Sequence, residues 1–76
     1  MKKKLVVVSR SKAERQFNNN PQVERMKLDN GKYDPAGMYI GKEVEVPENI
    51  LAVYPVRQKD AHGPYVRLWC YIRRAA

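Results

Sequence analysis

The chain has 76 residues, a formal net charge of +7, one cysteine and one histidine. This length predicts a single domain over residues 1–76, with flexible ends at residues 1–3 and 74–76. The lone Cys70 excludes an internal disulfide, and His62 and Asp60 supply too few ligands for a metal site, so we expect neither metal nor cofactor.

The N-terminal segment predicts a strand. Three lysines are followed by a short apolar run from Leu5 to Val8 that is rich in β-branched residues, which favours a strand over residues 3–9. The run is shorter than the roughly 7–15 apolar residues of a secretory signal, and far shorter than a membrane span. We therefore expect a cytoplasmic protein with no membrane contact.

A short helix is predicted next. Ser11 and Glu14 have the spacing of a capping box, in which each side chain accepts a hydrogen bond from the other residue's backbone amide. This motif predicts a helix over residues 12–18. The asparagines that follow, and the position before Pro21, disfavour its continuation.

A second short helix is predicted over residues 21–28. Pro21 suits the first turn of a helix, and Asn20 before it is a suitable N-cap. Val23 and Met26 then recur at helical spacing.

Residues 30–41 are rich in turn formers and predict an ordered loop. A short extended piece is expected within it at residues 38–40, with an edge strand as the alternative.

Residues 42–46 alternate between charged and apolar side chains, which predicts a strand with one wet face. Residues 47–49 are expected to turn the chain.

Two further strands complete the predicted fold. Residues 50–54 are apolar and read as a strand, and Pro55 indicates that this strand is an edge, is bulged, or ends there. After a loop at residues 58–64, the last strand returns antiparallel over residues 65–73. The fold class expected is α+β, a small, mainly antiparallel sheet of three to four strands with one or two short helices.

The last strand has two unlike faces, because side chains alternate along a strand. One face is apolar and is the predicted core, with Cys70 buried in it as a small hydrophobic residue. Its members are Val66, Leu68, Cys70 and Ile72. The other face is aromatic and cationic, and consists of Tyr65, Arg67, Trp69, Tyr71 and Arg73.

The aromatic and cationic face is the first candidate site. Trp, Tyr and Arg are enriched at binding hot spots, and a row of them resembles a platform on which bases could stack. The residues expected to bind a partner are Arg67, Trp69, Tyr71 and Arg73. The alternative is that a helix covers this face, with Trp69 packed against Phe17, Val23 or Met26 and the arginine head groups reaching solvent.

The N-terminal corner between the first strand and the first helix is the second candidate site. A helix N-terminus attracts anions, and the residues beside it here are strongly basic. The residues expected to bind a partner are Lys3, Lys4, Ser9, Arg10, Lys12 and Arg15. The alternative is a solvated basic tail followed by an ordinary helix cap.

Charge and composition favour a binding protein over an enzyme. Residues 1–16 carry a net charge of +5 and residues 57–76 a net charge of +4, around a neutral and then acidic middle. This distribution favours an anionic partner.

One histidine and one cysteine cannot form a nucleophile, base and orienting group, and Glu43 and Glu45 share an exposed strand face. We therefore expect no enzymatic activity and no small-molecule substrate.

In size, basicity and layout the chain resembles the small regulators that bacteriophages encode to take over host transcription. The resemblance rests on the lysine-rich start, the single cysteine, the helical segment after the first strand, and the ending from Val66 to Arg74. It implies binding to bacterial RNA polymerase or its associated factors, which would block initiation or promote antitermination. No signature motif carries it, so no site residue is transferred by position.

Direct binding of RNA or single-stranded DNA is the alternative function. It would use the aromatic and cationic face of the last strand, because stacking on aromatic side chains and contacts between basic residues and phosphates both suit an unpaired strand.

Overall fold

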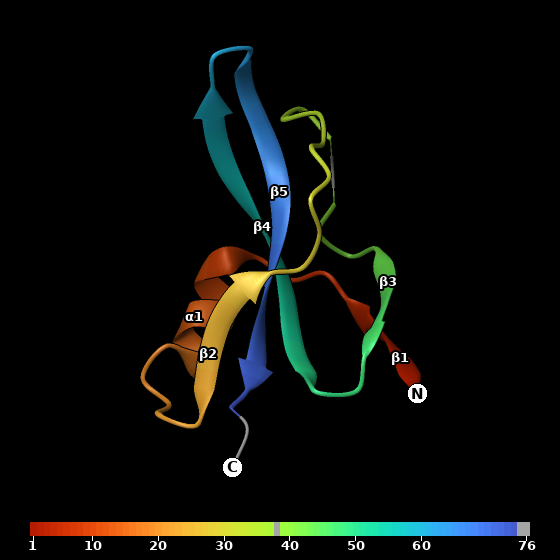
Figure 1. Cartoon of the computed structure of the whole chain (residues 1–76), viewed down its shortest axis with the longest axis vertical. Helices are drawn as coiled ribbons and strands as arrows, with labels where there is room; N and C mark the ends of the chain where they lie inside the picture. The colour runs from red at the N-terminus through yellow and green to blue at the C-terminus, as the bar shows by residue number, and fades with distance from the viewer. Residues whose placement is uncertain (38, 75–76) are drawn as a thin grey trace.

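The computed structural model describes residues 1–37 and 39–74, and within them it contains two antiparallel sheets and one helix. The two-stranded sheet pairs β1 (Lys2–Val6) with β3 (Glu43–Pro47). The three-stranded sheet has the order β2 (Val23–Lys27), β5 (Gly63–Arg73), β4 (Ile50–Asp60), and α1 (Arg10–Phe17) packs beside it (Figure 1). The predicted α+β class with a mainly antiparallel sheet is confirmed.

The chain ends are tied into the sheets within the described residues. Lys2 and Lys3, expected in a flexible end, lie in β1 and pair with Pro47 and Val46 of β3. At the other end, the backbone N–H of Arg74 donates to the carbonyl of Gln22 over 2.7 Å. Residues 75–76 lie outside the described residues.

The helix begins earlier than the predicted capping box. Ser9, not Ser11, is the N-cap, and its hydroxyl accepts a hydrogen bond of 3.2 Å from the backbone N–H of Lys12. Glu14 reaches Arg10 instead of the backbone, with 2.7 Å between the carboxylate and Nε. The reason is upstream, because the N–H of Val8 bonds the carbonyl of Val53 over 2.9 Å and holds the chain extended until just before Ser9.

The predicted second helix over residues 21–28 is wrong. The chain turns at Asn20, whose side-chain oxygen accepts from the N–H of Gln22 over 2.9 Å, and then continues as β2. β2 pairs antiparallel with β5, from Val23 opposite Arg73 to Lys27 opposite Trp69. Pairing with a distant strand outweighs the local helical spacing of two apolar residues.

The β4–β5 hairpin is longer than predicted. β4 continues through Pro55 to Asp60, and β5 begins at Gly63, so strands replace most of the loop expected at residues 58–64. Gly63 has a φ of +111°, which suits the tight turn. β4 lies at an edge of its sheet, which confirms the edge interpretation of Pro55. The tip of the hairpin extends beyond α1 (Figure 1).

The loop between β2 and β3 is anchored to β5. Tyr33 exchanges two backbone hydrogen bonds with Val66, of 2.8 and 2.9 Å, and its ring meets that of Tyr39 with centroids 5.2 Å apart. Of the extended piece expected at residues 38–40, Met38 lies outside the described residues, and Tyr39 and Ile40 belong to no strand.

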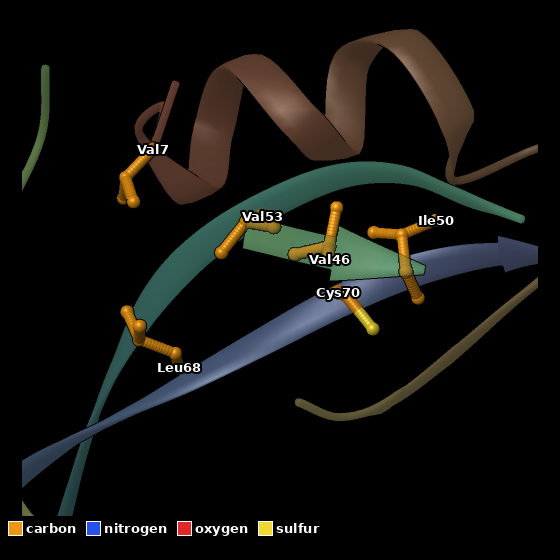
Figure 2. Close-up of a cluster of buried hydrophobic side chains, with 6 residues drawn as sticks. All are labelled: Val7, Val46, Ile50, Val53, Leu68 and Cys70. Carbon is orange, nitrogen blue, oxygen red and sulfur yellow. The ribbon is translucent and has the colours of Figure 1, made fainter. Parts of the chain in front are cut away.

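The core lies on both sides of the β4–β5 pair. The larger cluster consists of Val7, Val46, Ile50, Val53, Leu68 and Cys70 (Figure 2). It contains Leu68 and the fully buried Cys70 of the predicted core face of β5, and the partly buried Ile72 packs against it. Val66, the fourth residue of that face, is also buried. Burial raises the pKa of the Cys70 thiol to about 11. On the opposite face, a second cluster under α1 consists of Ala13, Val23, Ala52, Tyr54 and Tyr71.

Candidate functional site

The aromatic and cationic face of β5 extends over all three strands of its sheet. Residues paired across antiparallel strands point to the same face. Trp69 therefore has Lys27 of β2 on one side and Tyr54 of β4 on the other. We call this surface the basic-aromatic face, and it consists of Arg25, Lys27, Tyr54, Val56, Gln58, Tyr65, Arg67, Trp69 and Tyr71.

The helix covers one end of the basic-aromatic face. Tyr71 is only 2 % exposed, and its ring lies between Phe17 of α1, at 5.7 Å, and Tyr54, at 5.2 Å. The expectation that Tyr71 belongs to an open binding row is therefore corrected, because it is a core residue. Arg73 lies beyond Tyr71 and is separated from Trp69 by this covered segment.

A concave site of about 460 Å³ lies next to the covered segment, and we call it the arginine hollow. Its lining is Arg10, Arg25, Tyr54, Val56, Arg57, Gln58 and Trp69. Arg10 comes from the first turn of α1 and Arg25 from the edge strand β2. Arg57 of β4 touches the hollow, but it pairs with Val66 and its side chain therefore belongs to the opposite face of the sheet. No acidic side chain is among these lining residues. The arrangement therefore concentrates positive charge at one point of the surface.

The arginines of the hollow are largely free of carboxylates. Among residues 1–37 and 39–74, the ion pairs are Arg10 with Glu14, Lys32 with Asp60, and Arg74 with Glu24. Arg25 and Arg57 thus have no carboxylate within 4.0 Å in the part of the chain that the structure describes. Arg10 also stands where the helix dipole disfavours a cation, in a first turn without an acidic residue. These positions favour an external anion as the partner.

Trp69 presents part of its side chain to the site. Its indole Nε1 is buried and has no hydrogen-bond partner within the described residues. The exposed part of the ring is therefore what Trp69 offers to a partner in the arginine hollow.

Tyr54 is a neutral donor at the same place. Burial raises its pKa to about 12, and the neighbouring Tyr71 adds to the shift, while the guanidinium groups of Arg25 and Arg10 oppose it. Its hydroxyl therefore keeps its proton near neutral pH.

A second group of cations lies further along β5. Lys32 Nζ is 5.0 Å and Arg67 Cζ is 5.7 Å from the ring centroid of Tyr65. Lys32 also pairs with Asp60, and Arg67 Nη1 donates to the carbonyl of Asp29 over 3.4 Å. Tyr65 and Trp69 are four residues apart, or about 13 Å along the strand, with Arg67 between them.

The other expected residues lie elsewhere. Ser9 is committed to its helix cap, and Lys12 and Arg15 are exposed on α1. Lys4 is paired in register with Glu45 of β3, and Lys3 and Arg73 line a separate hollow that also contains Glu48. The two candidate sites thus meet at two places: Arg10 and Trp69 line the arginine hollow, and Lys3 and Arg73 line the hollow that contains Glu48.

The sequence-based prediction did not include two arginines that line the hollow, Arg25 and Arg57. Arg25 was placed on a predicted helix, and Arg57 stood next to a predicted loop. The local sequence carries no clear strand signal for Arg25, because the apolar Val23 and Met26 are three residues apart and do not alternate with period two.

No helix in the described chain has the length and apolar character needed to cross a membrane. Over the same residues, no group of three or more His, Cys, Asp or Glu side chains is arranged to hold a metal ion.

Comparison with known proteins gives a family match. Residues 3–73 match the model of a family described as "Protein of unknown function (DUF987)". The chain is 37 % identical over 65 residues to "Uncharacterized protein YeeT" of Escherichia coli K12, covering 82 % of this chain and 89 % of that protein. The YeeT proteins of Escherichia coli O6:H1 and O157:H7 match with the same values. No solved structure matches.

Proposed function

We propose that this chain, which belongs to the DUF987 family, binds single-stranded nucleic acid through the basic-aromatic face. The observation that carries the proposal is the arginine hollow, where Arg10, Arg25 and Trp69 come together without an acidic lining residue. Phosphate contacts from basic residues supply most of the affinity of such complexes. Aromatic side chains add base stacking that tolerates any sequence.

The shape of the face favours an unpaired strand over a duplex. Trp69 lies in a concave site, so a group that projects from the partner is needed to reach it. Bases of a single strand can be splayed out and stacked in this way, whereas bases of a duplex are already stacked on each other. Tyr65, with its two cations, offers a second contact further along the same strand.

Binding to RNA polymerase, implied by the resemblance to phage regulators, stays a second prediction. A cationic surface can also be steered to an acidic protein. A pull-down from bacterial lysate, with and without nuclease, separates the two. Polymerase subunits retained after nuclease treatment would support the polymerase, and partners lost with the nuclease would support nucleic acid. We expect either interaction to take place in the bacterial cytoplasm.

A titration with oligonucleotides tests the proposed function directly. Trp69 is the only tryptophan of the chain, so its fluorescence reports on the arginine hollow alone. We expect single-stranded RNA or DNA to change this fluorescence and a duplex of the same sequence to bind more weakly. The affinity should fall about tenfold or more over a few-fold rise in salt. Absence of binding to every oligonucleotide at low salt would refute the proposal.

A matched pair of variants places the contact. Arg25→Gln removes one charge from the arginine hollow, and Lys59→Gln removes one charge from β4 outside its lining. Both positions are exposed, so both variants should keep the fold. Arg25→Gln should weaken binding several-fold more than Lys59→Gln does. Equal losses would mean that only the overall charge attracts the strand.

A further inference from the structure

We infer that the arginine hollow binds a terminal phosphate, so that the chain recognises the end of a nucleic-acid strand rather than its interior. This inference rests on the proposed function and adds which part of the strand occupies the hollow. It depends on three features: the number of cations, the supply of donors, and the blocked path beyond Trp69.

The charge of the hollow suits a terminal phosphate better than an internal one. A phosphodiester carries one negative charge, whereas a terminal phosphate group carries about −1.5 to −2 at pH 7 and presents three strong acceptor oxygens. Arg10 and Arg25 line the hollow on the face of Trp69, and Arg10 also pairs with Glu14 through its Nε. Two guanidinium groups beside one another can bind a terminal phosphate, which carries more negative charge than a single phosphodiester.

The donors of the hollow match the acceptors of such a group. Each guanidinium has five N–H donors, and Arg10 uses its Nε towards Glu14, which leaves its terminal nitrogens available. The protonated hydroxyl of Tyr54, which also lines the hollow, is a donor without charge. No acidic residue is among the lining residues, and the Glu14 carboxylate beside Arg10 is bonded to its Nε.

The path of the strand ends at the hollow. A single strand lying along β5 would pass Tyr65 and Arg67 and then reach Trp69. Beyond Trp69 the face is closed, because Tyr71 is buried beneath Phe17 and Ala13 of α1. A strand that reaches the arginine hollow must therefore stop or turn away there. The volume of about 460 Å³ falls within the range of roughly 300–1,000 Å³ for ligand pockets, which allows a phosphate together with its nucleotide.

The test compares single strands that carry nearly the same charge but differ in their terminal groups. Four single strands of one sequence are titrated against Trp69 fluorescence: one with hydroxyl ends, one with a 5′-phosphate, one with a 3′-phosphate, and one with hydroxyl ends that is two residues longer. The last carries about the same charge as the phosphorylated strands. We expect one of the phosphorylated strands to bind about tenfold more tightly than the longer strand, as one or two added charge-assisted hydrogen bonds would give. The preferred end also gives the polarity of the strand on β5.

The same variants assign the preference to the hollow. Arg25→Gln should abolish the preference for the phosphorylated end and change the affinity for the hydroxyl-ended strand much less. Lys59→Gln should retain the preference, because Lys59 is outside the hollow. If the longer hydroxyl-ended strand binds as tightly as both phosphorylated ones, end recognition is wrong while nucleic-acid binding stands. If adenosine monophosphate competes as well as the phosphorylated strand, the hollow takes a free nucleotide and the inference fails. No binding by any strand would overturn the proposed function itself.

Discussion

The two faces of β5 differ in how completely they are buried in the folded chain. Val66, Leu68 and Cys70 are all buried, and each is at most 5 % exposed. On the other face only Tyr71 is buried to this extent, while Trp69 and Arg67 remain partly open beside the arginine hollow. The comparison shows that one strand supports the core over most of its length and leaves half of its other side available to a partner.

The difference follows from the lengths of the elements that cover each face. α1 has eight residues, or about 12 Å, and β5 has eleven residues, or about 36 Å. One short helix therefore covers one end of the strand and cannot reach Trp69 and Tyr65 together. The open part of the face carries Arg25, which has no carboxylate within 4.0 Å among the described residues, beside Trp69.

Leu68→Ala tests the buried face and should have the largest effect. Leu68 is 5 % exposed and packs in the larger core cluster, so truncation leaves a cavity. We expect the free energy of unfolding to fall by about 2–5 kcal/mol, measured by urea denaturation. A near-neutral result would mean that the two faces of β5 are assigned the wrong way round. Tyr65→Ala on the open face is the comparison, with a smaller loss.

Substitutions of Arg67 and Arg73, on the aromatic and cationic side of β5, should distinguish the open part of that face from the covered part. Arg67 lies between Tyr65 and Trp69, whereas Arg73 lies beyond the buried Tyr71. Arg67→Ala should weaken binding of a single strand by roughly 1 kcal/mol or more, and Arg73→Ala by much less. Titration of Trp69 fluorescence measures both. Equal losses would restore the continuous row expected from the sequence.

Tyr71→Phe probes the covered end of the face. The Tyr71 hydroxyl is buried and has no hydrogen-bond partner within the described residues. Removing an unpaired buried hydroxyl costs nothing in hydrogen bonding, so the variant should be as stable as the parent or more stable by up to about 1 kcal/mol. Thermal denaturation checks this. A clear loss of stability would show that the hydroxyl is hydrogen-bonded in solution.

The smallest expected effect is at the tip of the hairpin. The hydrogen bond from Lys32, assisted by the backbone N–H of His62, lowers the pKa of Asp60 from its usual 3.8. The carboxylate is thus favoured in the folded state, and its contribution is complete above pH 3.8 and lost as the pH falls through the lower folded-state pKa. Urea midpoints of the parent and of Asp60→Asn should therefore converge at acid pH. A gap that persists below that pKa would contradict the pairing.

The sequence predicted the strands whose patterns are long and regular. The alternation of β5 set both of its faces, and the core positions Val66, Leu68 and Cys70 could be read directly from it. The helix was also found, although its cap is Ser9 rather than Ser11. That shift depends on the backbone bond between Val8 and Val53, which a motif search over neighbouring residues cannot include.

The arginine hollow could be predicted only in part. Arg10 and Trp69 were both expected to bind a partner, but nothing in their local sequence indicated that they line one site. Arg25 depends on β2 pairing with a strand more than forty residues away. In a five-residue segment, Val23 and Met26 fit a helix as well as a strand, and the choice is made by the open edge of β5 rather than by the segment itself.

β2 forms one outer border of its sheet, and its backbone there could recruit an extra strand from another molecule. A second copy of β2, aligned antiparallel about its middle residue, would bring two Arg25 guanidinium groups face to face and repel itself. The arginine side chain that favours binding of a polyanion therefore also opposes association of two copies of the domain through β2.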